Sequence, residues 1–310
     1  MSIGFPIYSD TKLVKTALQS LISQTYSNIE IIISDDCSKG PEMSEVIKTF
    51  QNIFPKIKYF KQEKNLGRYY NSKFVLDKAT GEYFFWANQD DLWEPDFIKH
   101  LIKKMLSNPS LLISFCEYDN IGSNGIINKT YKLNWKNIVE NDKRIYRLLR
   151  FLWSDIWGTQ KANFFHGIMK KKHAHNYFSK VTSNDSNVCF GDDIWFLFYS
   201  LIEGRFGFVE KKLFHKGYEI VPHKPRPYNR NKLKEFNHSI TKHFYGLNRL
   251  VSQSNTVNYI DSIILKTAIF TKINSYKLYF LCYFLFISFK TVTREIIKRV
   301  YKRFVVTIKN

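Results

Sequence analysis

Three pairs of adjacent aspartates are the residues of this sequence that are best suited to chemistry. Adjacent carboxylates are costly unless they face water or a cation, and a positioned carboxylate can also take a proton from a substrate. The pairs are far apart in the chain and each follows or opens an element of the predicted fold: Asp35-Asp36, Asp90-Asp91 and Asp192-Asp193. If they act together, the fold must bring their segments to one place.

The first pair ends a β-branched run at residues 29–34, which reads as a strand. A carboxylate at the carboxyl end of a strand can accept hydrogen bonds from a nucleotide base or a ribose. The same stretch also suits a plain turn, because Ser38 and Gly40 follow and Asp, Ser and Gly are all preferred in turns. The local residues leave both interpretations open.

The second pair ends the apolar strand predicted around residues 83–87. Such a pair could bind Mn²⁺ or Mg²⁺, which take one or two carboxylates together with substrate phosphates. Alternatively, Asp91 could cap a helix that Glu94 and Pro95 open.

The third pair stands at the start of an aromatic helix that contains Trp195. There Asp193 could be a general base beside a glycan, with the aromatic rings forming an apolar platform for a sugar. A carboxylate that complements the helix dipole is the ordinary alternative.

The elements that must position these residues alternate between strands and helices. Strands are predicted near residues 3–7, 29–34, 57–60 and 83–87, with helices of ten or more residues between them. This order predicts βαβ units and a mostly parallel central sheet flanked by helices, an α/β fold whose ligands bind at the carboxyl ends of the strands. Strands at 206–209 and 214–221 follow a less regular middle part, and a helical appendix closes the chain.

The order of several motifs resembles that of family 2 glycosyltransferases, which have the GT-A fold. The resemblance runs from Gly4 to about Leu201, and its most specific piece is residues 18–38, LQSLISQTYSNIEIIISDDCS. The other matching pieces occur in the order of the family: Phe5-Pro6-Ile7-Tyr8, Asn65-Leu66-Gly67-Arg68, Thr80-Gly81-Glu82-Tyr83 and Gln89-Asp90-Asp91. This shared order of motifs favours the functional interpretation of all three aspartate pairs together.

The resemblance implies roles for individual residues around a nucleotide sugar. Pro6, Tyr8 and Asp36 would hold the nucleotide base, and Asp90 would face the ribose or sugar of the donor. Asp91 would ligate a Mn²⁺ or Mg²⁺ ion.

On the acceptor side, Asp193 would be the catalytic base of an inverting transfer, and Asp192 and Trp195 would contact the acceptor. Arg68 would pair with the diphosphate or be a solvated arginine at a helix start.

Two features bear on the metal site. Asn88 stands where relatives often have another carboxylate, which makes the predicted site less acidic. His215 and His223 lie where some relatives have a further metal or phosphate ligand, although a lone histidine is usually structural or exposed.

The charge balance points to an anionic partner. The chain has 310 residues, with 47 Lys and Arg against 27 Asp and Glu, and a formal net charge of +20. Such an excess attracts nucleic acid, anionic lipid or phosphorylated small molecules. No nucleic-acid-binding motif is present, and three acidic pairs would line a phosphate track poorly, so we expect no nucleic-acid partner. A nucleotide-sugar-binding scaffold without turnover is a further alternative, against which the retained Asp193 argues.

The C-terminal part predicts contact with a membrane surface. Basic residues recur every fourth position at Lys290, Arg294, Lys298 and Lys302, and apolar residues occupy the opposite phase. Beside the apolar run at residues 276–289, this pattern is typical of an interfacial helix on anionic lipid, or of a helix packed on the catalytic domain. The run is shorter than the roughly 20 residues that span a bilayer, and no signal peptide is recognised.

We therefore predict a GT-A catalytic domain at residues 1–231, in which 1–117 bind the nucleotide sugar and 118–231 bind the acceptor, and a helical, basic, membrane-associating region at 232–310. Four scattered cysteines without a Cys-x-x-Cys pair suit the cytosol, so the expected location is cytoplasmic, peripheral on the inner face of the cell membrane. The first candidate donor is a UDP-sugar and the second is dTDP-rhamnose. The expected acceptor is a lipopolysaccharide, capsule or other lipid-linked glycan.

Overall fold

The computed structural model of the protein describes residues 1–122, 126–131, 135–154, 161–180, 192–217 and 230–278. The strands are β1 (Ser2–Ile7), β2 (Glu30–Asp35), β3 (Ile57–Lys61), β4 (Tyr83–Trp86), β5 (Leu92–Trp93), β6 (Leu111–Ile121), β7 (Ile127–Tyr131), β8 (Ile168–Lys170) and β9 (Arg205–Gly217). They form one nine-stranded sheet in the order β3-β2-β1-β4-β8-β6-β9-β5, with β7 paired to β6.

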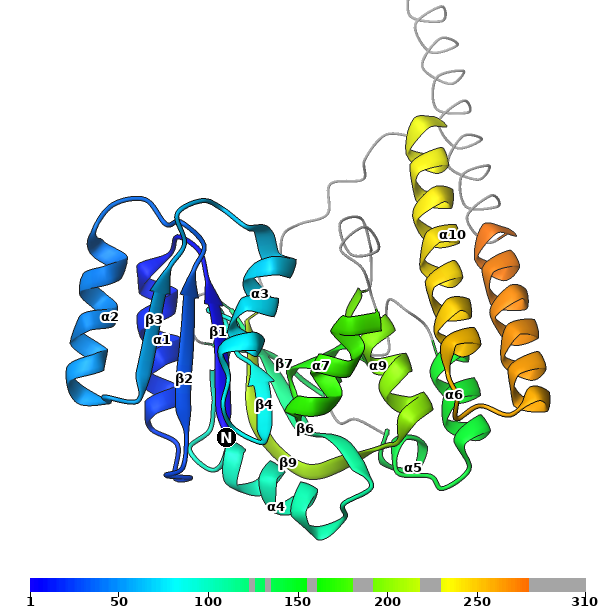
Figure 1. Ribbon diagram of the computed structural model, residues 1–310, viewed down its shortest axis with the longest axis horizontal. Helices are drawn as coiled ribbons and strands as arrows, with labels where there is room; N and C mark the ends of the chain where they lie inside the picture. Colours follow the sequence, from blue (N-terminus) through cyan, green and yellow to red (C-terminus); the bar gives the residue numbers. More distant parts are fainter. Residues whose placement is uncertain (123–125, 132–134, 155–160, 181–191, 218–229, 279–310) are drawn as a thin grey trace, which may run out of the picture.

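The N-terminal half of the sheet is parallel and its strands are joined by helices. The first three helices are α1 (Thr11–Ile22), α2 (Glu42–Ile53) and α3 (Gly67–Lys78). β1 pairs in parallel with both β2 and β4, and β2 pairs in parallel with β3 (Figure 1). The aliphatic run in β2 is fully buried because helices cover both faces of the sheet, as the sequence predicted.

The second half of the sheet mixes directions. β8 runs antiparallel to β4 and β6, and β9 runs parallel to β6. β9 is one continuous strand, whereas the sequence predicted two. The three polar residues Glu210, Lys211 and Lys212, which looked like a break, are exposed within the strand, where the pairing with β6 shifts register. Residues 218–221, the predicted end of the second strand, lie outside the described residues.

Six further described helices lie between residues 97 and 203. They are α4 (Phe97–Ser107), α5 (Lys136–Val139), α6 (Arg144–Trp153), the 3₁₀ helix η1 (Lys161–His166), α7 (Lys171–Lys180) and α9 (Asp192–Glu203). α9 is buried along most of its length and packs on η1 and α6. It therefore holds Asp193, in its first turn, against the body of the fold.

A pair of helices forms the C-terminal part of the described chain. α10 (Arg230–Gln253) lies beside the helix at residues 259–278 (Figure 1, yellow and orange), and the rings of Phe244 and Tyr276 meet with centroids 6.0 Å apart. The Trp195 indole donates to the carbonyl of His243 at 2.9 Å, and a side chain at Gly246 would collide with that indole. This close approach fixes α10 on α9.

Among the described residues, no helix has the length and apolar character needed to cross a bilayer. Residues 279–310, with the predicted basic and apolar faces of the tail, lie outside the described part. The suggested boundary near residue 231 falls at the first turn of α10.

Candidate active site

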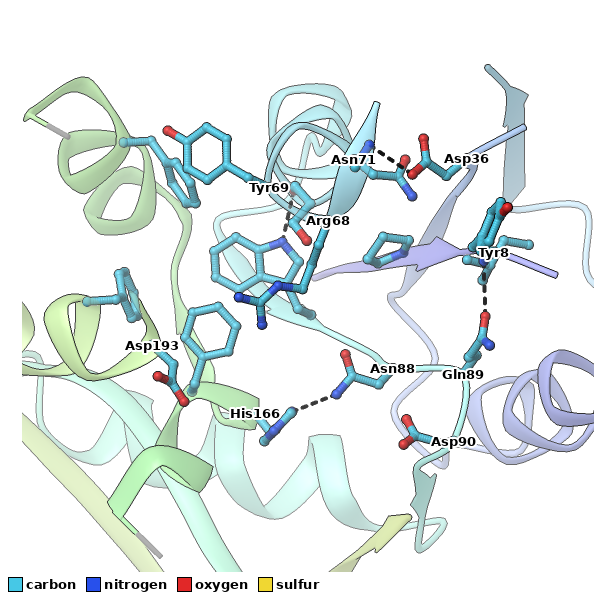
Figure 2. A pocket seen from close by; sticks show the side chains of 18 of the residues that line it. Tyr8, Asp36, Arg68, Tyr69, Asn71, Asn88, Gln89, Asp90, His166 and Asp193 are labelled. Atoms are coloured by element: carbon cyan, nitrogen blue, oxygen red, sulfur yellow. Dashed lines mark hydrogen bonds between the residues drawn. The ribbon is translucent and has the colours of Figure 1, made fainter. Parts of the chain in front are cut away.

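A cavity of about 640 Å³ opens at the carboxyl ends of β1, β2 and β4. Its lining comes from segments that are far apart in the sequence, and it includes one member of each aspartate pair: Asp36, Asp90 and Asp193. Figure 2 shows these three residues around one space, with Asp193 across from Asp36 and Asp90. The expectation that the fold brings the three segments together is therefore met for one carboxylate of each pair.

The loop after β1 forms the first wall. Pro6 and Tyr8 line the cavity, and the Tyr8 side chain is half exposed. The backbone N–H of Tyr8 donates to Oε1 of Gln89 at 3.0 Å (Figure 2). Gln89 thus ties the predicted base-contacting loop to the segment that carries Asp90, a positioning contact that the sequence did not reveal.

The Asp35-Asp36 pair divides into a structural and a cavity-facing member. Oδ1 of Asp35 accepts from the Ser38 backbone at 2.9 Å and Oδ2 accepts from the Tyr59 hydroxyl at 2.8 Å, so Asp35 closes the turn. Asp36 lines the cavity, and its Oδ2 accepts from the backbone N–H of Gly67 at 3.0 Å at the start of α3. Asp35 therefore makes the turn. Asp36 borders the cavity but is 4% exposed, because Oδ1 also accepts from the Leu66 backbone at 2.5 Å.

The Asp90-Asp91 pair divides in the same way. Asp90 lines the cavity. Asp91, predicted to ligate the metal, lies beneath the lining at 1% exposure, where Oδ1 accepts from the Gly217 backbone at 2.9 Å and Oδ2 accepts from the Asn88 amide at 3.1 Å. Burial raises the pKa of Asp91 to about 7, and the positive charge of Lys216 and these hydrogen bonds oppose the rise. The structure therefore presents Asp90, not Asp91, to a ligand in the cavity.

Two basic side chains that the sequence did not single out complete the floor beside Asp91. Lys216 lines the cavity from the end of β9, and its Nζ lies 3.1 Å from Nε2 of His166. His166 ends η1, stacks on Phe214 and is almost fully buried. Burial, with the charge of Lys216 adding to it, lowers the pKa of His166 well below 6.5, so the imidazole is neutral at pH 7.

The far wall is aromatic and ends at the third aspartate pair. Asp193 lines the cavity (Figure 2), and its Oδ1 accepts from the Ile194 backbone at 2.9 Å. Trp195 also borders the cavity, but it is 2% exposed because its indole packs on α10. The rest of this wall consists of aromatic rings from α3, β4, η1, α7 and α9: Tyr69, Trp86, Phe165, Tyr177, Phe178 and Phe196. An apolar wall beside a carboxylate suits the C–H face of a sugar.

Of the remaining predicted site residues, Arg68 lines the cavity and His215 does not. Arg68 lines the cavity and extends into it between Asn88 and Asp193 (Figure 2). His215 faces away from the cavity, with Nε2 2.7 Å from Oε1 of Glu94. His223 and the side chain of Asp192 lie outside the described residues.

Within the part of the chain that the structure describes, no three His, Cys, Asp or Glu side chains are arranged to hold a metal ion by themselves. The donor set nevertheless fits a hard divalent ion of the Mg²⁺ type, which usually takes one or two carboxylates and completes its coordination with water and substrate phosphates. Asp90 can supply that carboxylate from the cavity wall.

Comparison with protein families matches the model described as glycosyl transferase family 2 over residues 2–167. An uncharacterized glycosyltransferase of Rickettsia bellii is 30% identical over 173 residues, which are 54% of this chain and 24% of that protein. The uncharacterized protein y4gI of Sinorhizobium fredii is 27% identical over 14% of its length, and an uncharacterized glycosyltransferase of Rickettsia typhi is 35% identical over 37% of its length. The chain therefore spans well under half of each of these three proteins.

Solved structures share the fold at low sequence identity. Residues 1–349 of TarS from S. aureus match with a TM-score of 0.61 at 14% identity, covering 88% of this chain and 71% of that one, and the same fragment has been solved with UDP. The mannosyltransferase PcManGT from Pyrobaculum calidifontis, in complex with GDP-Man and Mn²⁺, matches with a TM-score of 0.54 at 13% identity, covering 88% and 72%.

Proposed function

The chain belongs to glycosyl transferase family 2 and has the GT-A fold, and from that membership we propose that it transfers a sugar from a nucleoside diphosphate donor to a hydroxyl group of a glycan. The observation that carries the proposal is that Asp36, Asp90 and Asp193 all line the same cavity. Its volume lies within the range of roughly 300–1,000 Å³ that is typical of small-molecule sites. One end is polar and carries Asp36 and Asp90 together with the cations Arg68 and Lys216, and the other is aromatic and carries Asp193.

The proposed transfer inverts the configuration of the donor sugar. Asp193 accepts a proton from the acceptor hydroxyl while that oxygen attacks the anomeric carbon from the face opposite the leaving group. The bond between the anomeric carbon and the diphosphate oxygen breaks, and its electron pair leaves with the nucleoside diphosphate. The position of Asp193 across the cavity from Asp36 and Asp90 supports this assignment (Figure 2).

We place the base of the donor near Pro6, Tyr8 and Asp36 and its diphosphate near Asp90 and Arg68. Asp90 would hold Mn²⁺ or Mg²⁺ together with the diphosphate, which revises the sequence prediction that gave this role to Asp91. When bound, the ion supplies Lewis-acid stabilisation of the leaving group. The proposed donor is a UDP-sugar, with dTDP-rhamnose as the alternative, and the proposed acceptor is a lipid-linked or cell-surface glycan.

A screen of nucleotide sugars tests this function. The chain is incubated with UDP-, dTDP- and GDP-sugars in Mn²⁺ or EDTA, and released nucleoside diphosphate is measured. We expect one nucleotide class to be hydrolysed slowly in Mn²⁺ and not in EDTA. If no donor is bound or hydrolysed under any condition, the proposed transfer is wrong.

We further propose that the C-terminal helices bind an anionic membrane surface from the cytoplasmic side. The helix at residues 259–278 lies beside α10 with Leu265, Ala268 and Ile269 buried, yet its exposed face also carries apolar side chains. Ile260 and Phe270 on that face are 68% and 66% exposed. An apolar strip on a chain with a net charge of +20 suits an anionic bilayer.

Sedimentation with vesicles tests the membrane proposal. We expect the chain to bind vesicles of mixed phosphatidylglycerol and phosphatidylcholine, and Ile260→Ser/Phe270→Ser to bind at least about tenfold more weakly because apolar area is lost from the interface. Ile53→Ser is the matched control, since Ile53 is equally exposed on α2 at 65%. Equal binding of all three proteins would refute a role for this face.

A further inference from the structure

The ammonium group at the end of β9 is held by side chains that belong to the cavity floor. Lys216 is the penultimate residue of β9, and its side chain lines the cavity, whereas the preceding His215 points away from it to Glu94. The next residue, Gly217, anchors the strand end by donating its backbone N–H to Asp91 at 2.9 Å. The strand end is therefore fixed at the point where Lys216 enters the cavity.

The contact between Lys216 and His166 has a defined direction. An ammonium group has donors and no acceptor, so Nε2 of His166, at 3.1 Å, must accept the hydrogen bond and the ring proton must lie on Nδ1. With its proton on Nδ1, the ring cannot also accept from the Asn88 amide nitrogen, which lies 3.4 Å from Nδ1 and donates to Asp91; Oδ2 of Asp91 lies 3.7 Å from Nδ1. The N–H thus faces the carboxylate, and a chain of polar contacts runs from Asp91 through His166 to Lys216.

The contacts of His166 hold both its own ring and the Lys216 ammonium group in place. His166 is held in plane by stacking on Phe214, with centroids 5.4 Å apart, and its Nε2 aims the ammonium group of a side chain that would otherwise have many rotamers. Where relatives often have a further carboxylate, this chain has the neutral Asn88. The charge of Lys216 is therefore not needed to neutralise a carboxylate at that position. A fixed ammonium group in a partly enclosed cavity is suited to an anionic ligand.

We propose that Lys216 is a binding residue for the distal phosphate of the nucleoside diphosphate, and that His166 is its positioning residue. This inference rests on the proposed function and adds a protein cation that stabilises charge on the leaving group alongside any divalent ion. Lys216 contacts the diphosphate directly, and His166 acts through Lys216.

Calorimetry with UDP and UMP, each in Mn²⁺ and in EDTA, tests the assignment. The wild-type chain should prefer UDP to UMP, and Lys216→Gln should reduce that preference by about 10–100-fold, the range of a charge-assisted hydrogen bond, in EDTA as well as in Mn²⁺. Lys212→Gln is the matched control, because it removes the same charge from the same strand, where Lys212 is half exposed and faces Asp119. Lys216→Arg should restore most of the preference.

Substitutions of His166 separate positioning from packing. His166→Gln keeps an acceptor for the ammonium group and should retain the UDP preference within about threefold, whereas His166→Phe should lose as much as Lys216→Gln. The double variant His166→Phe/Lys216→Gln should lose no more than either single one, because the two residues act as a unit.

The possible failures are distinguishable. If the wild type binds UDP and Lys216→Gln keeps the same UDP-to-UMP preference, even with a lower melting temperature, Lys216 only neutralises Asp91 and the inference is wrong. If the wild type binds none of UDP, dTDP and GDP, the proposed function itself fails.

Discussion

An Asp193→Asn variant loses about 10²–10⁴-fold in turnover and binds UDP as tightly as the parent chain. The amide has nearly the shape of the carboxylate and can still accept the hydrogen bond from the Ile194 backbone, so the start of α9 is kept. It cannot accept the proton of an acceptor hydroxyl. Because Asp193 lies across the cavity from Asp36 and Asp90, the nucleotide end of the site is unaffected (Figure 2).

The measurement pairs initial rates of donor turnover with UDP calorimetry. Glu203→Gln is the control, since it removes a carboxylate from the other end of α9, away from the cavity. If Asp193→Asn changes neither the rate nor the affinity, Asp193 is not the base. If both fall together, Asp193 supports the fold of the site and its role in proton transfer is not established.

Substitution of the second aspartate pair has the other large expected effect. Asp90→Asn should weaken UDP binding in Mn²⁺ by about 100-fold and leave binding in EDTA unchanged, because the only carboxylate of the pair that opens on the cavity is removed. Asp91→Asn should weaken Mn²⁺-supported binding less and lower the melting temperature, because Asp91 is buried and fastens Gly217.

Calorimetry of both variants in Mn²⁺ and in EDTA, with thermal unfolding measured alongside, distinguishes the two carboxylates. A metal-specific loss in Asp91→Asn with none in Asp90→Asn would restore the assignment made from the sequence. A loss of equal size in EDTA for Asp90→Asn would show that its carboxylate contacts the nucleotide and not a metal.

The secondary structure of the first third of the chain could be predicted from the sequence, because there the spacing of apolar residues matches the faces that the fold buries. The strands and helices of the first third of the chain were predicted because β2 is a short aliphatic run buried on both faces, and α1 and α2 each bury one apolar stripe. The parallel order of β1, β2 and β3 follows from such alternation. The family match over residues 2–167 covers the same region.

The sequence could not show which of two adjacent polar side chains faces the cavity. Either member of Asp90-Asp91 could have faced the cavity, and the choice depends on Gly217, which is 126 residues away in the chain and binds Asp91. The same holds for His215 and Lys216: neighbours in a strand face opposite sides, and the register shifts between β6 and β9 hide which one faces the cavity. His166 lay in an irregular stretch without periodicity, and its role becomes visible only through its contacts with Lys216 and Asp91.

The most direct test of a shared donor and acceptor cavity is an experimental structure of the chain with UDP and Mn²⁺. We predict the uracil ring beside Tyr8 and Asp36, the ion between Asp90 and the diphosphate, and the distal phosphate within hydrogen-bond distance of Lys216, with Asp193 left open to an acceptor. A nucleotide bound outside this cavity, or with its base against Asp193, would contradict it.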